Sequence, residues 1–135
     1  MTAGYSGTPL AKKLSFKNGM RVWFDGMPNN VREEIAAEGL QLHRLDAPEP
    51  RIDAAHVFVT GRDDLEAKLR QLMPFLARSG FIWVSWPKKA SKVPTDITED
   101  TIRAVCLPMG LVDVKVCAVD ATWSGLKLTK RKALR

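Results

Sequence analysis

The chain has 135 residues, of which 45% are hydrophobic and 27% charged, so it fits one soluble globular domain with a core of its own. Its longest apolar run is far shorter than the roughly 20 residues of a transmembrane helix, which excludes a membrane-spanning protein. The net charge of +6 comes mostly from residues 127–135, which hold five basic residues and no acid and leave only +1 for the rest.

The expected compartment is the cytoplasm. Residues 1–13 contain no apolar segment of the kind that a secretory signal needs. The two cysteines, Cys106 and Cys117, have no C-x-x-C spacing, so we interpret them as small buried hydrophobic residues in a reducing compartment.

Residues 1–18 are predicted to form an N-terminal loop and a short helix. Thr8 is a good N-cap and Pro9 suits the first helical position. Residues 20–24 are the first predicted strand, and the turn that leaves this strand, residues 25–28, contains a single glycine.

A helix is predicted to begin at Asn29 or Asn30 and to end at Gly39, because Asn30 and Glu33 have a spacing like that of a capping box. Short strands are expected over residues 40–45 and 55–60. In the next helix, Asp63 and Glu66 are predicted to cap the start, Pro74 to kink the helix and Gly80 to end it. Its apolar stripe follows a 4, 3, 4 spacing along Leu65, Leu69, Leu72 and Leu76.

The residues Phe81-Ile82-Trp83-Val84 are apolar at odd and even positions alike, which is typical of a strand covered on both faces. Pro87 cannot donate a ladder hydrogen bond and should end this strand. Lys88 and Lys89 follow at once, so the central strand is predicted to deliver a basic loop to the carboxyl edge of the sheet.

The last part of the chain predicts one helix and a hairpin. The helix begins at Thr98 and ends at Gly110. Strands over residues 111–119 and 123–130 form an antiparallel hairpin, with Val112, Val114 and Val116 on one face of the first strand. Residues 131–135 form a basic tail.

Together these elements predict one α/β domain over residues 1–135, three-layered and Rossmann-like. A mostly parallel sheet with a terminal antiparallel hairpin is expected in the order 2-1-3-4-6-5. This order looks like a shortened S-adenosylmethionine methyltransferase fold, a likeness of fold alone. The single glycine at Gly26 counts against cofactor binding, because such a site needs glycines after the first strand for the backbone to approach the cofactor.

The loops at the carboxyl edge hold the candidate ligand site, since ligands of open α/β sheets bind there. The basic side chains favour an anion and Trp86 offers an aromatic face, although a solvated basic loop explains the same residues. The candidate ligand-binding residues are Asp25, Gly26, Arg62, Ser85, Trp86, Lys88 and Lys89.

No catalytic constellation is predicted. Ser85 lacks the G-x-S-x-G elbow of a nucleophilic serine. His43 and His56 lie in predicted strands and have no partner spacing for a metal ion or a triad. We therefore predict no catalytic residue, no metal ion and no cofactor.

Several motifs resemble a small bacterial family that is catalogued only as a domain of unknown function. They are Gly4-Tyr5-Ser6-Gly7-Thr8-Pro9-Leu10-Ala11-Lys12-Lys13-Leu14, Val84-Ser85-Trp86-Pro87-Lys88-Lys89-Ala90, the stretch from Leu111 to Val119, and Thr122 to Leu128. The resemblance covers nearly the whole chain and implies a bacterial, cytoplasmic, single-domain protein. It supplies no activity and no catalytic residues. Ser15-Phe16 departs from the Gly-Ile that the family often has there.

The leading functional prediction is a non-catalytic binding or regulatory module with an anionic small molecule or a protein partner at the basic edge. One alternative is a reduced methyltransferase-like enzyme, suggested by the strand order. The other is nucleic-acid binding through residues 127–135, which is disfavoured because a short basic tail is usually a solvated end. The oligomeric state is left open.

Overall fold

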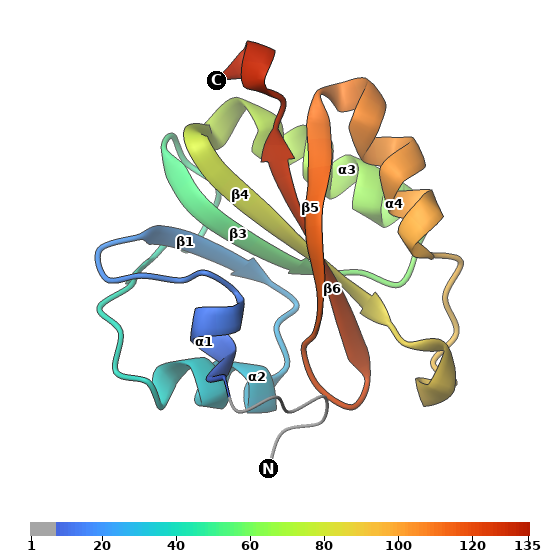
Figure 1. Cartoon of the computed structure of the whole chain (residues 1–135), viewed down its shortest axis with the longest axis horizontal. Coiled ribbons are helices and arrows are strands. Elements are labelled where there is room, and N and C mark those ends of the chain that lie inside the picture. The colour runs from blue at the N-terminus through green and yellow to red at the C-terminus, as the bar shows by residue number, and fades with distance from the viewer. Residues whose placement is uncertain (1–7) are drawn as a thin grey trace.

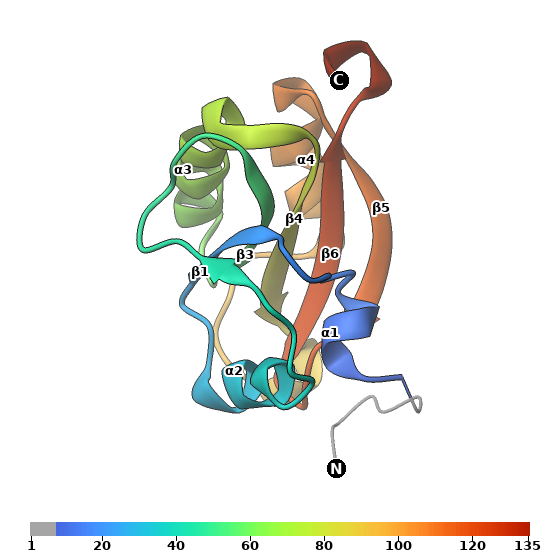
Figure 2. The ribbon, with the colours of Figure 1, turned by 90° about the vertical axis from the view of Figure 1, so that its left-hand side faces the viewer.

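The computed structural model describes residues 8–135, which form a six-stranded mixed sheet with helices on both faces (Figures 1 and 2). Its strands are β1 (Arg21–Asp25), β2 (His43–Arg44), β3 (Ile52–Phe58), β4 (Leu76–Pro87), β5 (Leu111–Ala118) and β6 (Trp123–Lys130). Its helices are α1 (Leu10–Lys13), α2 (Asn29–Ala36), α3 (Arg62–Leu72) and α4 (Glu99–Cys106), and the short 3-10 turns are Met73–Phe75, Lys89–Ser91, Leu107–Met109 and Lys132–Leu134.

The strand order is β2-β1-β3-β4-β6-β5, which confirms the predicted order. Strands β2, β1, β3 and β4 are parallel, whereas β6 is antiparallel to both β4 and β5. The chain is therefore α/β with a terminal antiparallel hairpin, as its sequence predicts.

The middle of β4 is enclosed on both sides. Ile82, Trp83 and Val84 are fully buried, and Phe81 is 5% exposed. These residues pair with β3 on one side and with β6 on the other. The indole Nε1 of Trp83 donates a hydrogen bond to the Leu14 carbonyl oxygen at 2.8 Å, which ties the N-terminal segment to the centre of the sheet.

Alternating side chains of the sheet divide the core into two clusters. One face packs under α3 and α4, for example Leu65 and Leu69 of α3 against Val84. The other face packs under α1 and α2, where Val31 and Ile35 join Trp83. Figure 2 shows the two pairs of helices on opposite sides of the sheet.

Several local predictions are wrong. Gly80 lies inside β4 and ends no helix, because the strand begins at Leu76. The strand expected over residues 40–45 is reduced to His43–Arg44. Helix α3 has Gly61 as its N-cap with no side-chain cap, so Asp63 and Glu66 do not form the expected capping pair.

Two further predictions concern helix boundaries. Pro74 lies in the 3-10 turn that follows α3, where the missing N–H ends the helix instead of kinking it. The N-cap of α1 is Pro9 and not Thr8. By contrast, Thr98 caps α4 as expected, in a reciprocal capping box with Thr101.

A bulge breaks the alternation that was predicted for β5. The register shifts between Asp113 and Lys115, so Val114 has no paired residue on β6. Val112 then lies opposite Thr129, while Val116 lies opposite the core residue Leu126. The valines of this strand therefore do not share one face.

The helices formed by residues 8–135 are all too short or too polar to cross a bilayer. Both cysteines are free: Cys106 is buried and Cys117 half-buried. Burial raises the pKa of the Cys106 thiol to about 11.

Candidate functional site

Strands β1, β3 and β4 are parallel and end at one edge of the sheet. The connection after β1 runs through α2 on one face, and the connection after β3 runs through α3 on the other. The crossovers thus diverge between β1 and β3, which is the position where open α/β sheets bind ligands.

Asp25 is the last residue of β1, and its carboxylate forms an ion pair with Lys68 of α3. Both side chains are partly shielded, with 30% of Asp25 and 20% of Lys68 exposed. Burial lowers the pKa of Lys68. One ion pair therefore links the end of β1 to the helix on the opposite side of the switch point.

Gly26 makes the turn that leaves β1. Its φ is +72°, a backbone conformation that residues with a Cβ rarely adopt. A Cβ built there would lie 3.3 Å from the Phe58 carbonyl oxygen at the end of β3. The next residue, Met27, is buried. The turn is thus packed against β3, with one glycine where a nucleotide-binding loop usually has several.

The structure adds Asp46, which the sequence reasoning overlooked. It follows β2 at the same edge, just after Leu45, whose N–H donates to the Val22 carbonyl oxygen at 2.8 Å. Asp46 is exposed. It lies twenty residues after Gly26, which is about the spacing between a glycine turn and the acidic residue that binds ribose hydroxyls in dinucleotide folds. That spacing is the signal in the sequence from which Asp46 could have been predicted.

Arg62 opens α3, where its backbone N–H donates to the Asp96 carboxylate at 2.8 Å. The Thr95 hydroxyl donates to the Thr60 carbonyl oxygen at 2.6 Å, so the loop before α4 is fastened to the end of β3. The Arg62 side chain is exposed and forms no ion pair within residues 8–135.

Ser85 and Trp86 are neighbours in β4 and therefore lie on opposite faces of the sheet. The Ser85 hydroxyl is fully buried, 2.7 Å from Nε2 of His56. Trp86 belongs to the cluster under α3 and α4. The two residues, predicted as parts of one site, do not meet.

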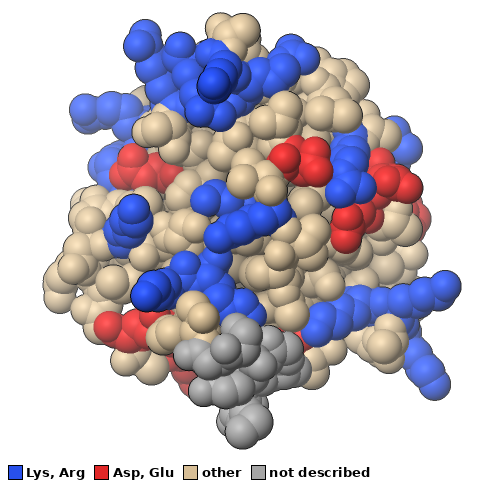
Figure 3. All heavy atoms as spheres, viewed as in Figure 1, with Lys and Arg blue, Asp and Glu red and all other residues tan. Residues whose placement is uncertain are grey.

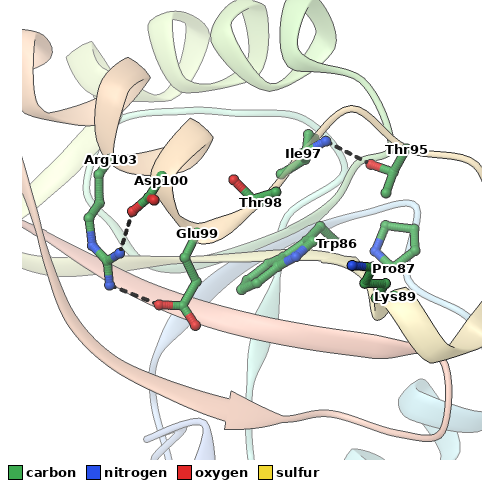
Figure 4. Close-up of a pocket in the computed structure, with 9 residues that line it drawn as sticks. All are labelled: Trp86, Pro87, Lys89, Thr95, Ile97, Thr98, Glu99, Asp100 and Arg103. Carbon is green, nitrogen blue, oxygen red and sulfur yellow. Dashed lines mark hydrogen bonds and ion pairs between the residues drawn. The ribbon is translucent and has the colours of Figure 1, made fainter.

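Trp86 and Lys89 line a cavity of about 590 Å³ at the end of β4 (Figure 4). Helix α4 and the loop before it provide most of the rest of the lining. The other lining residues are Pro87, Thr95, Ile97, Thr98, Glu99, Asp100 and Arg103. Asp25, Gly26, Arg62, Ser85 and Lys88 do not line it.

An ion-pair cluster forms one wall of this cavity. The Arg103 guanidinium donates to Glu99 at 2.9 Å, to Asp100 at 3.1 Å and to Asp113 of β5 at 3.0 Å. The hydrogen bond from Arg103 lowers the pKa of Asp113, and the same bond, with that to Glu99, raises the pKa of Arg103.

The charges of this cavity do not favour an anion. Its two cationic side chains, Lys89 and Arg103, are balanced by the carboxylates of Glu99 and Asp100. Lys88 does not line this cavity, and its backbone N–H donates to the Thr122 carbonyl oxygen at 2.7 Å. An aromatic wall, two hydroxyls and two carboxylates suit a small polar or cationic ring compound better.

The residues at the switch point fit an adenosyl group, but with fewer contacts than a glycine-rich loop provides. Asp46 is an exposed carboxylate that can accept hydrogen bonds from two ribose hydroxyls. Gly26 gives the tight turn after β1. Pro28 stands two positions after Gly26, where a second glycine usually lies, and Met27 between them is buried, so the backbone approach is limited to one residue.

The family model described as "Protein of unknown function (DUF3052)" matches residues 11–132. No curated protein matches the sequence.

Several solved structures resemble the fold at low sequence identity. A protein assigned as a type 11 methyltransferase from Sulfolobus solfataricus has a TM-score of 0.60 at 14% identity, over 91% of this chain and 90% of that one. A ribosomal protein L11 methylase from Lactobacillus delbrueckii subsp. bulgaricus has a TM-score of 0.58 at 11% identity, over 90% and 75%. OxaC in complex with SAH and oxaline has a TM-score of 0.61 at 14% identity, over 92% and 46%.

These structures correct the leading functional prediction. At such identities they show the fold alone, and the fold is that of methyltransferases. The prediction of a non-catalytic binding or regulatory module is therefore wrong. The comparisons favour its alternative, a reduced methyltransferase-like protein.

Proposed function

This chain belongs to the DUF3052 family of proteins of unknown function, and we propose that it is a reduced methyltransferase-like enzyme. The observation that carries the proposal is the arrangement at the switch point of this fold. A left-handed glycine turn at Gly26 follows β1, and an exposed carboxylate, Asp46, follows the neighbouring strand β2. Both features serve a ribose-containing ligand in folds of this class.

The proposed donor is S-adenosylmethionine, which when bound supplies an activated methyl group. In this proposal Asp46 accepts hydrogen bonds from the ribose hydroxyls, and Gly26 lets the backbone approach the ligand. The ion pair of Asp25 with Lys68 holds the end of β1 in place beside the ligand. Because the turn has a single glycine, we expect it to bind S-adenosylmethionine more weakly than a glycine-rich loop does.

The proposed acceptor site is the cavity beside Trp86. Trp86 provides a flat wall for an aromatic or heterocyclic acceptor. Glu99, which lines the same cavity, is the hydrogen-bond acceptor for a hydroxyl or amine of that compound, and its ion pair with Arg103 at 2.9 Å orients it. The proposal includes a bacterial cytoplasmic setting, which the free thiols of Cys106 and Cys117 support.

Titration calorimetry with S-adenosylmethionine and S-adenosylhomocysteine tests the donor site. We expect measurable binding that Asp46→Asn weakens about tenfold, the effect of losing a charge-assisted hydrogen bond. Glu49→Gln is the matched control, because Glu49 is an acid of the same loop whose carboxylate pairs with Arg21 at 2.6 Å. The absence of heat at high micromolar ligand, or equal losses in both variants, would overturn the proposal.

Release of S-adenosylhomocysteine tests the acceptor site. The wild type is incubated with S-adenosylmethionine and a panel of small hydroxyl- and amine-bearing ring compounds. Trp86→Ala is expected to abolish any turnover while leaving donor binding unchanged, whereas Trp123→Ala, at a half-buried tryptophan outside the cavity, should keep it. Equal turnover in the wild type and Trp86→Ala would show that the acceptor does not bind in this cavity.

A further inference from the structure

Two lysines face each other across the terminal hairpin. Lys115 of β5 and Lys127 of β6 are direct register partners, on the sheet face that packs under α1 and α2 farther along. Like charges directly opposite each other destabilise a strand pair. Lys127 lies over the Phe81 ring, 4.4 Å from its centroid, and donates to the Ser15 hydroxyl at 3.1 Å. The hairpin thus keeps an arrangement that costs stability.

The bulge at Val114 produces this arrangement. Before the bulge, Asp113 lies on the α4 face, where it binds Arg103 at 3.0 Å. Strict alternation from Asp113 would also place Lys115 on that face, beside the ion-pair cluster. The extra residue turns Lys115 to the opposite face instead, toward Lys127. Bulges commonly re-aim a side chain in this way.

Further lysines gather around this pair. Burial is the largest cause of the lowered pKa of Lys127, and the nearby charges of Lys115 and Lys17 lower it further. Lys13 donates from Nζ to the Ala118 carbonyl oxygen at 3.1 Å. Burial raises the pKa of the Cys117 thiol, and Lys13, Lys115 and Lys88 all oppose that rise, so Lys88 lies near the same strand. We call this surface the lysine face; it comprises Lys13, Lys17, Lys88, Lys115 and Lys127. Figure 3 shows blue side chains across the middle of the same side of the molecule.

Carboxylates do not neutralise the lysine face. Within residues 8–135, none of its members forms an ion pair. The acids nearby have neutral partners: Glu38 accepts from the Ala11 N–H at 2.6 Å, and Asp120 accepts from the Asn30 side chain at 2.9 Å. The charge is therefore available to a ligand.

We propose that the lysine face binds the phosphate backbone of a nucleic acid. The lysines follow the hairpin from the carboxyl edge, at Lys88, toward the basic residues after β6. The eight residues of β6 span about 26 Å, which equals about seven phosphates of one strand when the length is measured along the axis of a B-form duplex. A row of unpaired cations suits a linear polyanion better than a compact one, and contacts to phosphate carry no sequence preference.

This proposal is independent of the methyltransferase proposal. It differs from the alternative in which residues 127–135 alone bind nucleic acid. The sequence places the lysines up to 114 positions apart, from Lys13 to Lys127, and only folding brings them together. The two proposals fail separately, because one is tested by nucleoside binding and the other by salt-dependent binding of an oligonucleotide.

The test is fluorescence anisotropy with a labelled 20-nucleotide RNA of mixed sequence between 50 and 300 mM NaCl, repeated with DNA and with duplexes. Removing one lysine should make the negative slope of log K against log salt less steep by about 0.7, the effect of losing one single-strand phosphate contact. The affinity should fall about fivefold at 0.1 M salt. Lys115→Gln is the first variant and Lys17→Gln/Lys115→Gln the second, which should double the change in slope.

Arg70→Gln is the matched control, because it also removes one exposed positive charge but lies on α3, over the other face. Lys115→Gln relieves the repulsion with Lys127, so its Tm should not fall, and weaker binding then cannot come from unfolding. Equal losses in Lys115→Gln and Arg70→Gln overturn the proposal, as does the absence of salt-dependent binding by the wild type. Lysine-dependent flotation with phosphatidylserine vesicles, without RNA binding, would assign the face to a membrane surface instead.

Discussion

Nε2 of His56 and the Ser85 hydroxyl meet at 2.7 Å between β3 and β4, and neither residue is exposed to solvent. The other ring nitrogen of His56, Nδ1, is buried without a hydrogen-bond partner within residues 8–135. The tautomer with the proton on Nε2 is favoured, because an unpaired acceptor at Nδ1 costs less than a buried N–H donor without a partner. This pair is a structural feature of the core and is closed to substrates.

Burial of His56 makes folding sensitive to acid. Desolvation lowers the pKa of His56 to about 3 from its ordinary value of 6.5. Because the folded state binds this proton less readily, stability is complete above about pH 6.5 and is lost as the pH falls toward 3. Between pH 6.5 and 4.5 the free energy of unfolding should drop by about 2–3 kcal/mol from this group. Urea unfolding at several pH values measures the drop.

The variant His56→Leu/Ser85→Ala should flatten that pH dependence, since it removes the titrating group together with its partner. His43→Gln is the control, because His43 lies exposed on β2. A pH profile that is equally steep in the double variant and the wild type would show that His56 is not its source.

Gly26→Ala and Gly39→Ala form a matched pair. Both glycines have φ near +70°, but a Cβ at Gly39 meets nothing within 4 Å, whereas one at Gly26 meets the Phe58 carbonyl oxygen at 3.3 Å. Gly39→Ala should cost about 1–2 kcal/mol from the left-handed backbone alone. Gly26→Ala should cost more and should also weaken nucleoside binding. Urea unfolding together with calorimetry separates the two effects, and equal costs would argue against the close approach of β3.

Trp83 connects the N-terminal segment to the sheet. Trp83→Phe leaves the buried Leu14 carbonyl oxygen without its 2.8 Å hydrogen bond and opens space in the core, so it should cost about 2–3 kcal/mol. Trp123→Phe, at a half-buried tryptophan that contacts Phe58 edge-on, should cost less than about 1 kcal/mol. Chemical denaturation followed by far-UV circular dichroism gives both values, and a larger loss at Trp123 would contradict this assignment.

Most of the fold can be predicted from the sequence because apolar runs are local signals. The run from Phe81 to Val84 marks the central strand, and Thr98 marks the start of α4. The strand order follows from these elements and from the handedness of crossovers. Gly80 gives a wrong prediction because a glycine inside a strand looks, from the local sequence, like a glycine that ends a helix. In the structure this glycine lies close to the Ile52 carbonyl oxygen.

The candidate site depends on contacts between distant residues, which sequence does not reveal. Lys68 binds Asp25 across 43 positions, and nothing local marks the pair. The cavity of Trp86 takes its charged wall from Arg103 of α4. The bulge at Val114 has no glycine or proline to announce it, so the face of Lys115 could not be predicted. The sequence therefore shows where basic residues lie along the chain but not where they lie in space.

Thr98 controls both α4 and the cavity that this helix borders. The Thr98 hydroxyl accepts from the Thr101 N–H at 3.2 Å, and the Thr98 N–H donates to the Thr101 hydroxyl at 3.1 Å. Thr98→Ala removes the first of these bonds and should cost about 1 kcal/mol, whereas Thr98→Ser keeps it and should cost only a few tenths. Because Glu99 and Arg103 lie in the turns that this cap holds, Thr98→Ala should also reduce turnover in the acceptor assay without changing donor binding. Urea unfolding and the two ligand assays on the same preparations check this, and a donor site that weakens in step with the acceptor site would show that α4 supports both.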